Sequence, residues 1–336
     1  MSEADKKEKE RFLSYTEAEK EAVELMLKKS SDIVLMGQGI NDENAMFGVT
    51  DGLFEKYGTD RIFDTPLAET GLTGVAIGLA MSGYKVLYMH NRPDFLYLAM
   101  DQIINHAAKY SYMSGGQVDI PLVVWSVTGQ GWGSAAQHSQ NIHGIMMQVP
   151  GLKIVMPTTP ADAKGLLKTA MDDKSPVLFL EHRRLFGQKR VVPEGEYEVP
   201  FGKGVLRREG TDVTVIAISA MVIDAIEASG RLQEEGISTE VIDLRTVKPY
   251  DRELLISSVS KTKRVVIADT SWITGSVAKE ISEFIYRELF GILEKRIEIV
   301  ALPDVPTPAA YVLEDIYYQN ADSIYNAVKR LMEDKE

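Results

Sequence analysis

Pro121-Leu122-Val123-Val124-Trp125-Ser126-Val127 is a nearly continuous apolar run, and a glycine-rich segment follows it. A short apolar run without polar alternation is typical of a strand buried on both faces of a parallel sheet. Four similar runs lie at 33–36, 85–89, 153–156 and 177–180. Helical patterns separate the runs, at 65–81, 95–113 and 160–172. This alternation predicts an α/β fold in which helices cover both faces of a parallel sheet.

The N-terminal part of the chain predicts one more helix. Thr16-Glu17-Ala18-Glu19 has the pattern of a capping box and is expected to open a helix that runs to about Lys29. Ala18, Ala22, Leu25 and Met26 are expected on its inner face.

The second half of the chain repeats the same alternation after an interruption. Residues 187–204 are rich in charge, proline and glycine, which predicts a linker. Strands are then predicted at 213–218, 240–244 and 264–268, and helices at 222–235, 251–259, 276–289 and 321–332. A chain of 336 residues is long enough for two domains. We therefore expect two doubly wound parallel-sheet domains, 15–186 and 205–336, with residues 1–14 as a flexible N-terminus.

Composition limits the class of protein. The net charge of -12 offers no basic face for nucleic acid, so a polyanionic partner is not expected. The chain has no Cys, which removes disulfides and thiolate chemistry and is compatible with a cytoplasmic location. No apolar run is long enough to span a bilayer, and the charged N-terminus lacks the apolar core of a secretion signal.

Glu69 is the first candidate for chemistry, within Asp64-Thr65-Pro66-Leu67-Ala68-Glu69-Thr70-Gly71. Thr65 is expected to cap a helix and Pro66 to occupy its first position, which puts Glu69 in the first turn. Behind it, Gly71, Gly74 and Gly78 form a stripe on which another backbone could approach closely. An acid beside this stripe indicates an active site at a contact between chains. The alternative is that Glu69 only complements the positive end of the helix.

His138 is the second candidate, in the glycine-rich segment Thr128-Gly129-Gln130-Gly131-Trp132-Gly133-Ser134-Ala135-Ala136-Gln137-His138. Ligands bind outside the carboxyl ends of parallel strands, so a loop in this place is well positioned for catalysis. A structural, hydrogen-bonded imidazole is the alternative. His138 and His143 do not have the spacing of a helical zinc site, and we do not expect zinc. Phe95 could offer a flat face to an aromatic ring, or could simply pack in the core.

Several quoted stretches occur together in one family. The chain carries, in order, Asp64–Gly71 as written above, Met100-Asp101-Gln102-Ile103-Ile104-Asn105, Tyr112-Met113-Ser114-Gly115-Gly116, Ala136-Gln137-His138-Ser139-Gln140, Pro150-Gly151-Leu152-Lys153-Ile154-Val155 and Val241-Ile242-Asp243-Leu244-Arg245-Thr246. Over nearly its whole length it resembles the beta subunit of the thiamine-diphosphate-dependent 2-oxo acid dehydrogenases. The resemblance implies a pyrimidine-binding domain followed by a transketolase C-terminal-like domain.

The same resemblance implies roles for individual residues. Glu69 would hydrogen-bond a ring nitrogen of the coenzyme's aminopyrimidine, which favours the imino form that activates the coenzyme. Phe95 would pack on the pyrimidine, Gln38 would lie at the coenzyme pocket, and His138 would steady the substrate carboxylate or transfer a proton. The implied reaction is decarboxylation of a 2-oxo acid, with transfer of the acyl group to a lipoyl group on a separate acyltransferase.

The resemblance also implies partners and ions. Family alpha subunits hold the diphosphate and Mg²⁺ with a Gly-Asp-Gly motif, which this sequence lacks, so an alpha subunit in an α2β2 heterotetramer is expected to supply the magnesium ligands. A structural potassium ion is implied in this chain, bound mostly by backbone oxygens. The matching positions are Leu122, Ala170, Met171, Asp173 and Ser175.

Three departures from the family pattern stand near the expected pocket. Gln38 and Met89 replace acids, which removes negative charge, and His90-Asn91-Arg92-Pro93 replaces a more apolar stretch. We hypothesise that His90 or Arg92 faces the substrate entrance and favours an acid with an extra anionic or polar group. The alternative is a solvated turn.

Other functions remain open from the sequence. Acetoin cleavage uses the same subunit design, and the C-terminal half of a split transketolase shares the fold and the coenzyme. A non-catalytic structural or regulatory subunit could also retain the fold. The presence of Glu69, Phe95 and His138 argues against this last alternative.

Overall fold

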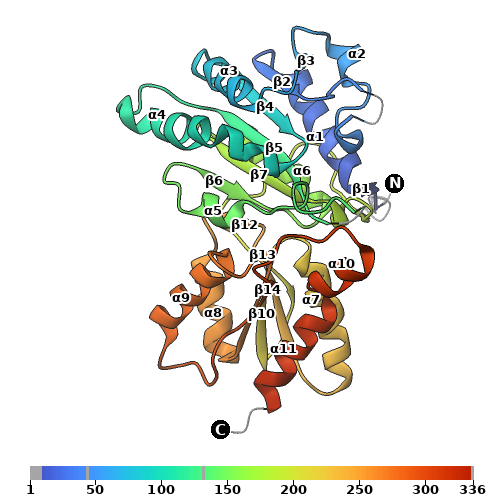
Figure 1. The fold of residues 1–336 in the computed structure, drawn as a ribbon, viewed down its shortest axis with the longest axis vertical. Coiled ribbons are helices and arrows are strands. Elements are labelled where there is room, and N and C mark those ends of the chain that lie inside the picture. The colour runs from blue at the N-terminus through green and yellow to red at the C-terminus, as the bar shows by residue number, and fades with distance from the viewer. Residues whose placement is uncertain (1–9, 43–44, 131–132, 334–336) are drawn as a thin grey trace, which may run out of the picture.

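The chain forms two α/β units, each a sheet with its own helices, and they lie one above the other in Figure 1. They are called the first layer and the second layer below. The computed structural model describes residues 10–42, 45–130 and 133–333. The predicted fold class of two doubly wound, mainly parallel sheets is confirmed. Every helix among the described residues is too short or too polar to cross a lipid bilayer.

The first layer is a seven-stranded sheet in the order β12-β6-β7-β5-β4-β2-β3. Its strands are β2 (Ile33–Gly37), β3 (Ile62–Asp64), β4 (Lys85–His90), β5 (Leu122–Thr128), β6 (Lys153–Val155), β7 (Val177–His182) and β12 (Thr246–Lys248). All neighbouring strands are parallel except β12, which pairs antiparallel with β6. Because β12 follows the linker in sequence, the second half of the chain completes the sheet of the first half.

Helices cover both faces of this sheet. They are α1 (Tyr15–Lys29), α2 (Leu53–Tyr57), α3 (Glu69–Met81), α4 (Ala108–Met113), α5 (His143–Met147) and α6 (Pro160–Asp172). α1 and α6 pack on the face that presents Leu35, Leu87 and Val123. α3 and the segment before α4 pack on the opposite face, against Val34, Val86 and Val124. The side chains of each strand alternate between the two cores, as the pleat requires.

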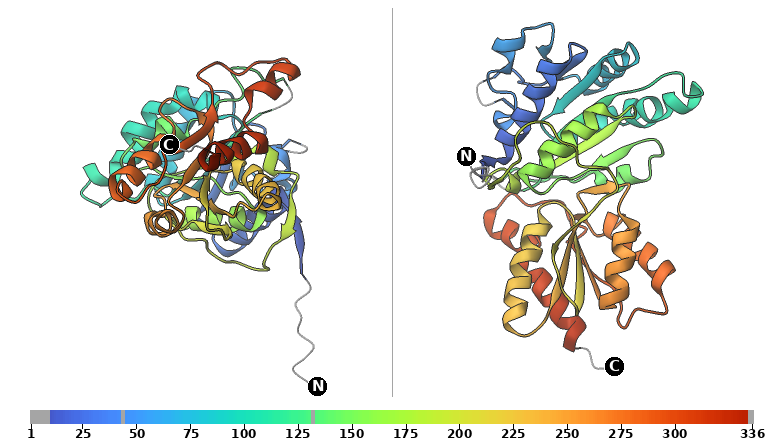
Figure 2. Two further views of the ribbon diagram at one scale, coloured as in Figure 1. Left: turned by 90° about the horizontal axis from the view of Figure 1, so that it is seen from below. Right: turned by 180° about the vertical axis from the view of Figure 1, so that it is seen from behind.

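The second layer is a five-stranded sheet in the order β14-β13-β10-β11-β9. Its strands are β9 (Val205–Arg208), β10 (Val213–Ala217), β11 (Thr239–Asp243), β13 (Val265–Trp272) and β14 (Glu298–Leu302). Its helices are α7 (Met221–Glu234), α8 (Arg252–Thr262), α9 (Val277–Leu289), α10 (Tyr311–Tyr317) and α11 (Ala321–Glu333). α7 and α11 lie on one side of the sheet and α8 and α9 on the other, which Figure 2 shows from behind.

The segments expected to be irregular contain a short sheet. β1 (Phe12–Ser14) pairs antiparallel with β8 (Lys189–Val191). The end of the expected flexible N-terminus is therefore held against the expected linker, and residues 1–9 lie outside the described part of the chain.

Three local predictions were wrong. α1 is capped two residues earlier than predicted, because the capping box is formed by Ser14 and Glu17, and Leu27 rather than Leu25 is buried. α3 begins at Glu69, with Ala68 as N-cap, so Thr65 and Pro66 precede the helix instead of opening it. The single helix predicted at 95–113 is a 3₁₀ segment (Pro93–Ala99), a π segment (Gln102–Ala107) and α4.

Candidate active site

Glu69 lies where three strand ends meet. It is the first residue of α3, directly after the loop that leaves β3, and its side chain is buried. Its Oε1 accepts a hydrogen bond from Gln38 Nε2 at 3.3 Å, and Gln38 follows the last residue of β2. The Gln38 carbonyl in turn accepts from Asn91 Nδ2, just after β4, at 3.3 Å. The neutral amide of Gln38 therefore orients the carboxylate without adding a second negative charge.

The predicted α3 glycine stripe is open on its outer side. A Cβ at Gly71, Gly74 or Gly78 would meet nothing within 4 Å outside the helix itself. Apolar side chains beside the stripe are also exposed, Leu67 to 80% and Leu98 to 59%. The Thr70 hydroxyl donates to the Leu98 carbonyl at 2.6 Å, which holds the start of α3 against the 3₁₀ segment. Glu69 is thus buried at the rim of a surface on which none of the described residues packs.

His90 is the last residue of β4, and its side chain is 1% exposed. Burial lowers the pKa of this imidazole to about 4, although the charge of Glu69 opposes the shift. Its ring meets the Tyr88 ring edge-to-face at 5.2 Å, and its Nε2 has no hydrogen-bond partner among the described residues. At neutral pH His90 is therefore an uncharged imidazole below the surface of the site.

Phe95 and His138 come together from different strand ends. Phe95 lies in the 3₁₀ segment after β4, and His138 lies in the loop after β5. Their rings meet edge-to-face with centroids 5.4 Å apart. The Gln140 amide donates to Asp94 Oδ1 at 3.1 Å, which ties the two segments together. Gly131 and Trp132 of the same loop lie outside the described residues.

The loop after β5 is also held from the β7 side. Gly129 has φ +105°, and a Cβ there would lie 2.6 Å from the His182 ring, so this position requires glycine. Burial, and then the charges of Arg184 and Arg183, lower the pKa of His182 to about 3. Arg183 Nη2 donates to the Gln130 carbonyl. Sequence reasoning missed His182, Arg183 and Asp94, although the first two stand at the carboxyl end of a predicted strand and could have been found there.

His143 is a structural contact between the two layers. Its Nε2 is 2.7 Å from Asp269 Oδ1 at the second sheet, and both side chains are fully buried. Asn141 Nδ2 donates to the Thr270 carbonyl at 2.9 Å beside it. Within 10–42, 45–130 and 133–333, no three His, Asp or Glu side chains are grouped as metal ligands. His138 and His143 are thus used differently, one exposed at the site and the other locked across the interface.

Comparisons with known proteins identify the family of the chain. Residues 12–189 match the family described as transketolase, pyrimidine binding domain, and residues 202–324 match transketolase, C-terminal domain. The chain is 39% identical to the acetoin:2,6-dichlorophenolindophenol oxidoreductase subunit beta of Cupriavidus necator, over 96% of this chain and 98% of that one. It is also 39% identical to the 2-oxoisovalerate dehydrogenase subunit beta of Bacillus subtilis, over 96% and 99%.

A third relative, the pyruvate dehydrogenase E1 component subunit beta of Rickettsia felis, is 39% identical over 95% of this chain and 98% of that one. This chain belongs to the beta-subunit family of the 2-oxo acid dehydrogenases. A solved split gene transketolase, described as an inactive beta4 tetramer, superposes with a TM-score of 0.76 at 25% identity, covering 95% and 97%. The lower identity favours the dehydrogenase family over the split transketolase.

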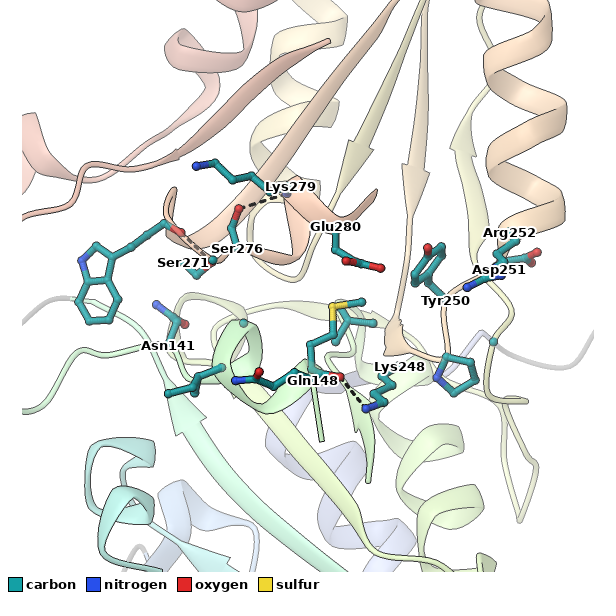
Figure 3. A pocket seen from close by; sticks show the side chains of 18 of the residues that line it. Asn141, Gln148, Lys248, Tyr250, Asp251, Arg252, Ser271, Ser276, Lys279 and Glu280 are labelled. Atoms are coloured by element: carbon teal, nitrogen blue, oxygen red, sulfur yellow. Dashed lines mark hydrogen bonds between the residues drawn. The ribbon is translucent and has the colours of Figure 1, made fainter. Parts of the chain in front are cut away.

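A large cavity of this family member lies away from Glu69. It has a volume of about 1190 Å³ and separates the first layer from α8 and α9. Figure 3 shows Asn141 and Gln148 on one side of it and Ser276 and Glu280 on the other. Lys248 closes its lower edge by donating to the Met147 and Val149 carbonyls at 2.5 Å each. Glu69, Phe95 and His138 are not among its lining residues, so the candidate site is an open surface and not this cavity.

The residues implied for potassium gather at the opposite end of the first sheet. Leu122 opens β5, Ala170 and Met171 lie in the last turn of α6, and Asp173 is its C-cap. The Ile120 amide donates to the Lys174 carbonyl at 2.9 Å, which brings the two segments together. The Asp173 carboxylate pairs with Lys153 and accepts from the Ser175 amide at 2.8 Å. The Asp173 carboxylate is therefore already paired with Lys153, and the potassium site stays a prediction that would depend on backbone oxygens.

Proposed function

We propose that this chain is the beta subunit of a thiamine-diphosphate-dependent 2-oxo acid dehydrogenase and that it forms one wall of the coenzyme site. The observation that carries the proposal is the buried carboxylate of Glu69, oriented by Gln38 and placed beside an uncovered glycine stripe. An acid buried at an open edge is expected where a second chain completes the site. The 39% identity to three beta subunits supports the same assignment.

Each residue has a proposed task. When bound, thiamine diphosphate supplies the electron sink for breaking the bond between the carboxylate and carbonyl carbons of a 2-oxo acid. Glu69 would accept a hydrogen bond from a ring nitrogen of the aminopyrimidine. Phe95 would pack against that ring, and His138, in edge contact with Phe95, would hydrogen-bond the reacting substrate or transfer a proton during acyl transfer to a lipoyl group.

The partner we propose is an alpha subunit, in an α2β2 heterotetramer, that brings the ligands of Mg²⁺ and binds the diphosphate. The exposed stripe of α3 supports this, because helices with small residues on one face let another chain approach closely. A lipoyl acyltransferase is the proposed acyl acceptor.

The test uses the assembled complex with a Glu69→Gln variant. Coenzyme-dependent turnover of a 2-oxo acid should be lost, while assembly and thermal stability stay near those of the parent. Glu55→Gln is the matched control, since Glu55 also lies in the first turn of a helix but is exposed on α2. Full activity in Glu69→Gln, or tight coenzyme binding and turnover by this chain alone, would contradict the proposal.

Acetoin is the second candidate substrate, and the relative from Cupriavidus necator favours it. The same complex should be given acetoin and a panel of 2-oxo acids with an artificial electron acceptor. Turnover of acetoin alone would assign the chain to that branch of the family.

We further propose that backbone oxygens near Ala170 and Leu122 bind a structural potassium ion. The complex should have a higher melting temperature in a potassium salt than in a sodium salt of the same ionic strength. Equal melting temperatures in the two salts would remove this proposal.

A further inference from the structure

The turn after β4 contains a guanidinium group with unmet hydrogen-bonding capacity. Arg92 is half-buried, and its Nη1 is buried without a hydrogen-bond partner in the part of the chain that the structure describes. It forms no ion pair within 4 Å among those residues. Buried polar groups are nearly always paired, and a buried N–H group without an acceptor is unfavourable. The unpaired Nη1 of Arg92 indicates that a ligand supplies the missing hydrogen-bond acceptor.

A second guanidinium lies near the first. Arg183 follows β7, and burial, followed by the charge of Arg92, lowers the Arg183 pKa to about 10, although Tyr318 and Glu314 oppose the shift. β4 and β7 both pair with β5, so the two arginines flank the carboxyl end of β5. This is the edge of a parallel sheet at which ligands bind. Two cations at one crevice repel each other, and an anion between them would relieve that repulsion.

No neighbouring group among the described residues forms an ion pair with Arg92. His90 contributes no negative charge, and burial keeps it neutral with a pKa of about 4. Asp94 is the nearby acid, and its charge supports the protonated form of Arg92 from beyond ion-pair distance. Asp94 Oδ1 is already used by the Gln140 amide, which holds the loop that carries His138. Arg92 thus remains available to a ligand.

Arg92 also has a suitable place relative to the reacting groups. It is the N-cap of the 3₁₀ segment and precedes Phe95, whose ring meets that of His138, by three residues. Arg92 stands beside the residues proposed to act on the reacting carbon and not among them, which suits it to another part of the substrate. Pyruvate and 2-oxoisovalerate have apolar tails, for which an arginine offers nothing.

We infer that Arg92 binds the distal carboxylate of the substrate, and that this chain therefore serves an enzyme for dianionic 2-oxo acids, that is, 2-oxo dicarboxylic acids. A planar guanidinium can hold a carboxylate by two parallel hydrogen bonds. The inference rests on the proposed function for the reaction, while the anion site itself stands on Arg92 and its surroundings.

The test compares Arg92→Gln and Arg92→Lys with the parent in the assembled complex. Calorimetry with glutarate, an unreactive dicarboxylate, and with butyrate, its monoanionic counterpart, measures binding without turnover. The parent should prefer glutarate, and Arg92→Gln should weaken glutarate binding by about 10- to 100-fold with little effect on butyrate. Arg92→Lys keeps the charge but loses the two parallel hydrogen bonds, so its affinity for glutarate should lie between those of the parent and Arg92→Gln. Arg190→Gln is the control, because Arg190 is exposed on β8.

Steady-state kinetics provides an independent arm. With 2-oxoglutarate, Arg92→Gln should raise KM and leave kcat nearly unchanged, whereas the constants for neutral acetoin should stay the same. Equal binding of glutarate by the parent and by Arg92→Gln would overturn the inference, and this equality is expected if Arg92 only contacts Asp94 through water. A preference of the parent for butyrate would overturn it as well. Failure to turn over any substrate would contradict the proposed function, and the calorimetry would still decide the role of Arg92.

Discussion

His90 and His182 are the residues at which burial most changes protonation near the candidate site. Both end a strand of the first sheet, and their side chains are 1% and 3% exposed. Removal from water lowers the pKa of His90 to about 4 and that of His182 to about 3. His182 also needs a neutral Nδ1, because this atom accepts from the Arg184 amide at 3.3 Å. Protonation of either residue therefore opposes the native packing.

We predict that acid destabilises this protein through these two residues. An unfolded histidine binds a proton near pH 6.5, whereas the folded ones resist protonation to about pH 4 and about pH 3, so the unfolded state holds more protons between these values. The two histidines should not affect the free energy of unfolding above pH 6.5, and this free energy should fall as the pH decreases below 6.5. At pH 5 the loss is about 2 kcal/mol for each residue.

Urea unfolding between pH 7.5 and pH 5 measures this slope. His182→Asn should make the free energy of unfolding depend less on pH, whatever its effect on stability at neutral pH. His106→Asn, at an exposed position, should keep the slope of the parent. A His182→Asn variant with the slope of the parent would show that this residue does not govern acid sensitivity.

At the scale of the element, α3 has two different faces. Ala76, Ile77 and Ala80 pack in the core, while Gly71, Gly74 and Gly78 face outward without neighbours. Glycine lowers helix stability by about 1 kcal/mol relative to alanine, so three outward glycines are unfavourable for the isolated chain. Their presence is understandable if another chain packs on them.

Gly74→Leu is therefore predicted to act in opposite directions on the chain and on the complex. The chain alone should gain about 0.5–1 kcal/mol from better helix propensity. Assembly with the alpha subunit should be lost, because the leucine side chain would occupy the space of the partner. The measurements are the melting temperature of the chain and co-purification of the two subunits.

Gly230→Leu is the matched control for this experiment, since Gly230 is an exposed glycine of α7 that also has nothing within 4 Å. It should give the same stabilisation with normal assembly. Normal assembly of Gly74→Leu would mean that the stripe is not the contact surface.

At the scale of the whole molecule, charged contacts fasten the two layers. Arg207 on β9 pairs with Asp243 of its own layer at 2.8 Å and with Asp162 of α6. Arg245 pairs with Asp162 at 2.9 Å, and Thr158 donates to Asp243 at 3.0 Å. Burial raises the pKa of Asp243, and Arg207 opposes that rise. The layers are thus joined by a network of charges as well as by β12 and by His143 with Asp269.

Arg207→Ala is predicted to destabilise the protein by about 3 kcal/mol, because removal of one partner leaves a buried charge without compensation. The loss should appear as a lower urea midpoint or as separate unfolding of the two layers. Arg296→Ala, which removes an exposed partner of Glu298 and leaves its pair with Arg330, should cost less than about 1 kcal/mol. Equal costs for the two variants would show that the network contributes no more than a surface pair.

Some of this architecture was predictable because its signals are local. The buried strands and most helices could be predicted to within a few residues from apolar runs and helical periodicity, since each such pattern reflects one element and its own burial. The caps of α1 and α3 were misplaced, because Ser14 and Thr16 are equally good caps in sequence and the choice depends on where β1 and β3 end. The broken helix of residues 93–113 was missed because its apolar spacing resembles that of a regular helix.

The sequence by itself determined the fold class, the position of Glu69 in a first turn and the family, because these depend on residue order along the chain. Tertiary structure alone decided which side chains meet: Gln38 with Glu69, and Phe95 with His138. It also moved β12 into the sheet of the first layer. The physical reason is that strand order and the packing of loops at the sheet edge are set by contacts between residues far apart in sequence, for which a local pattern has no signal.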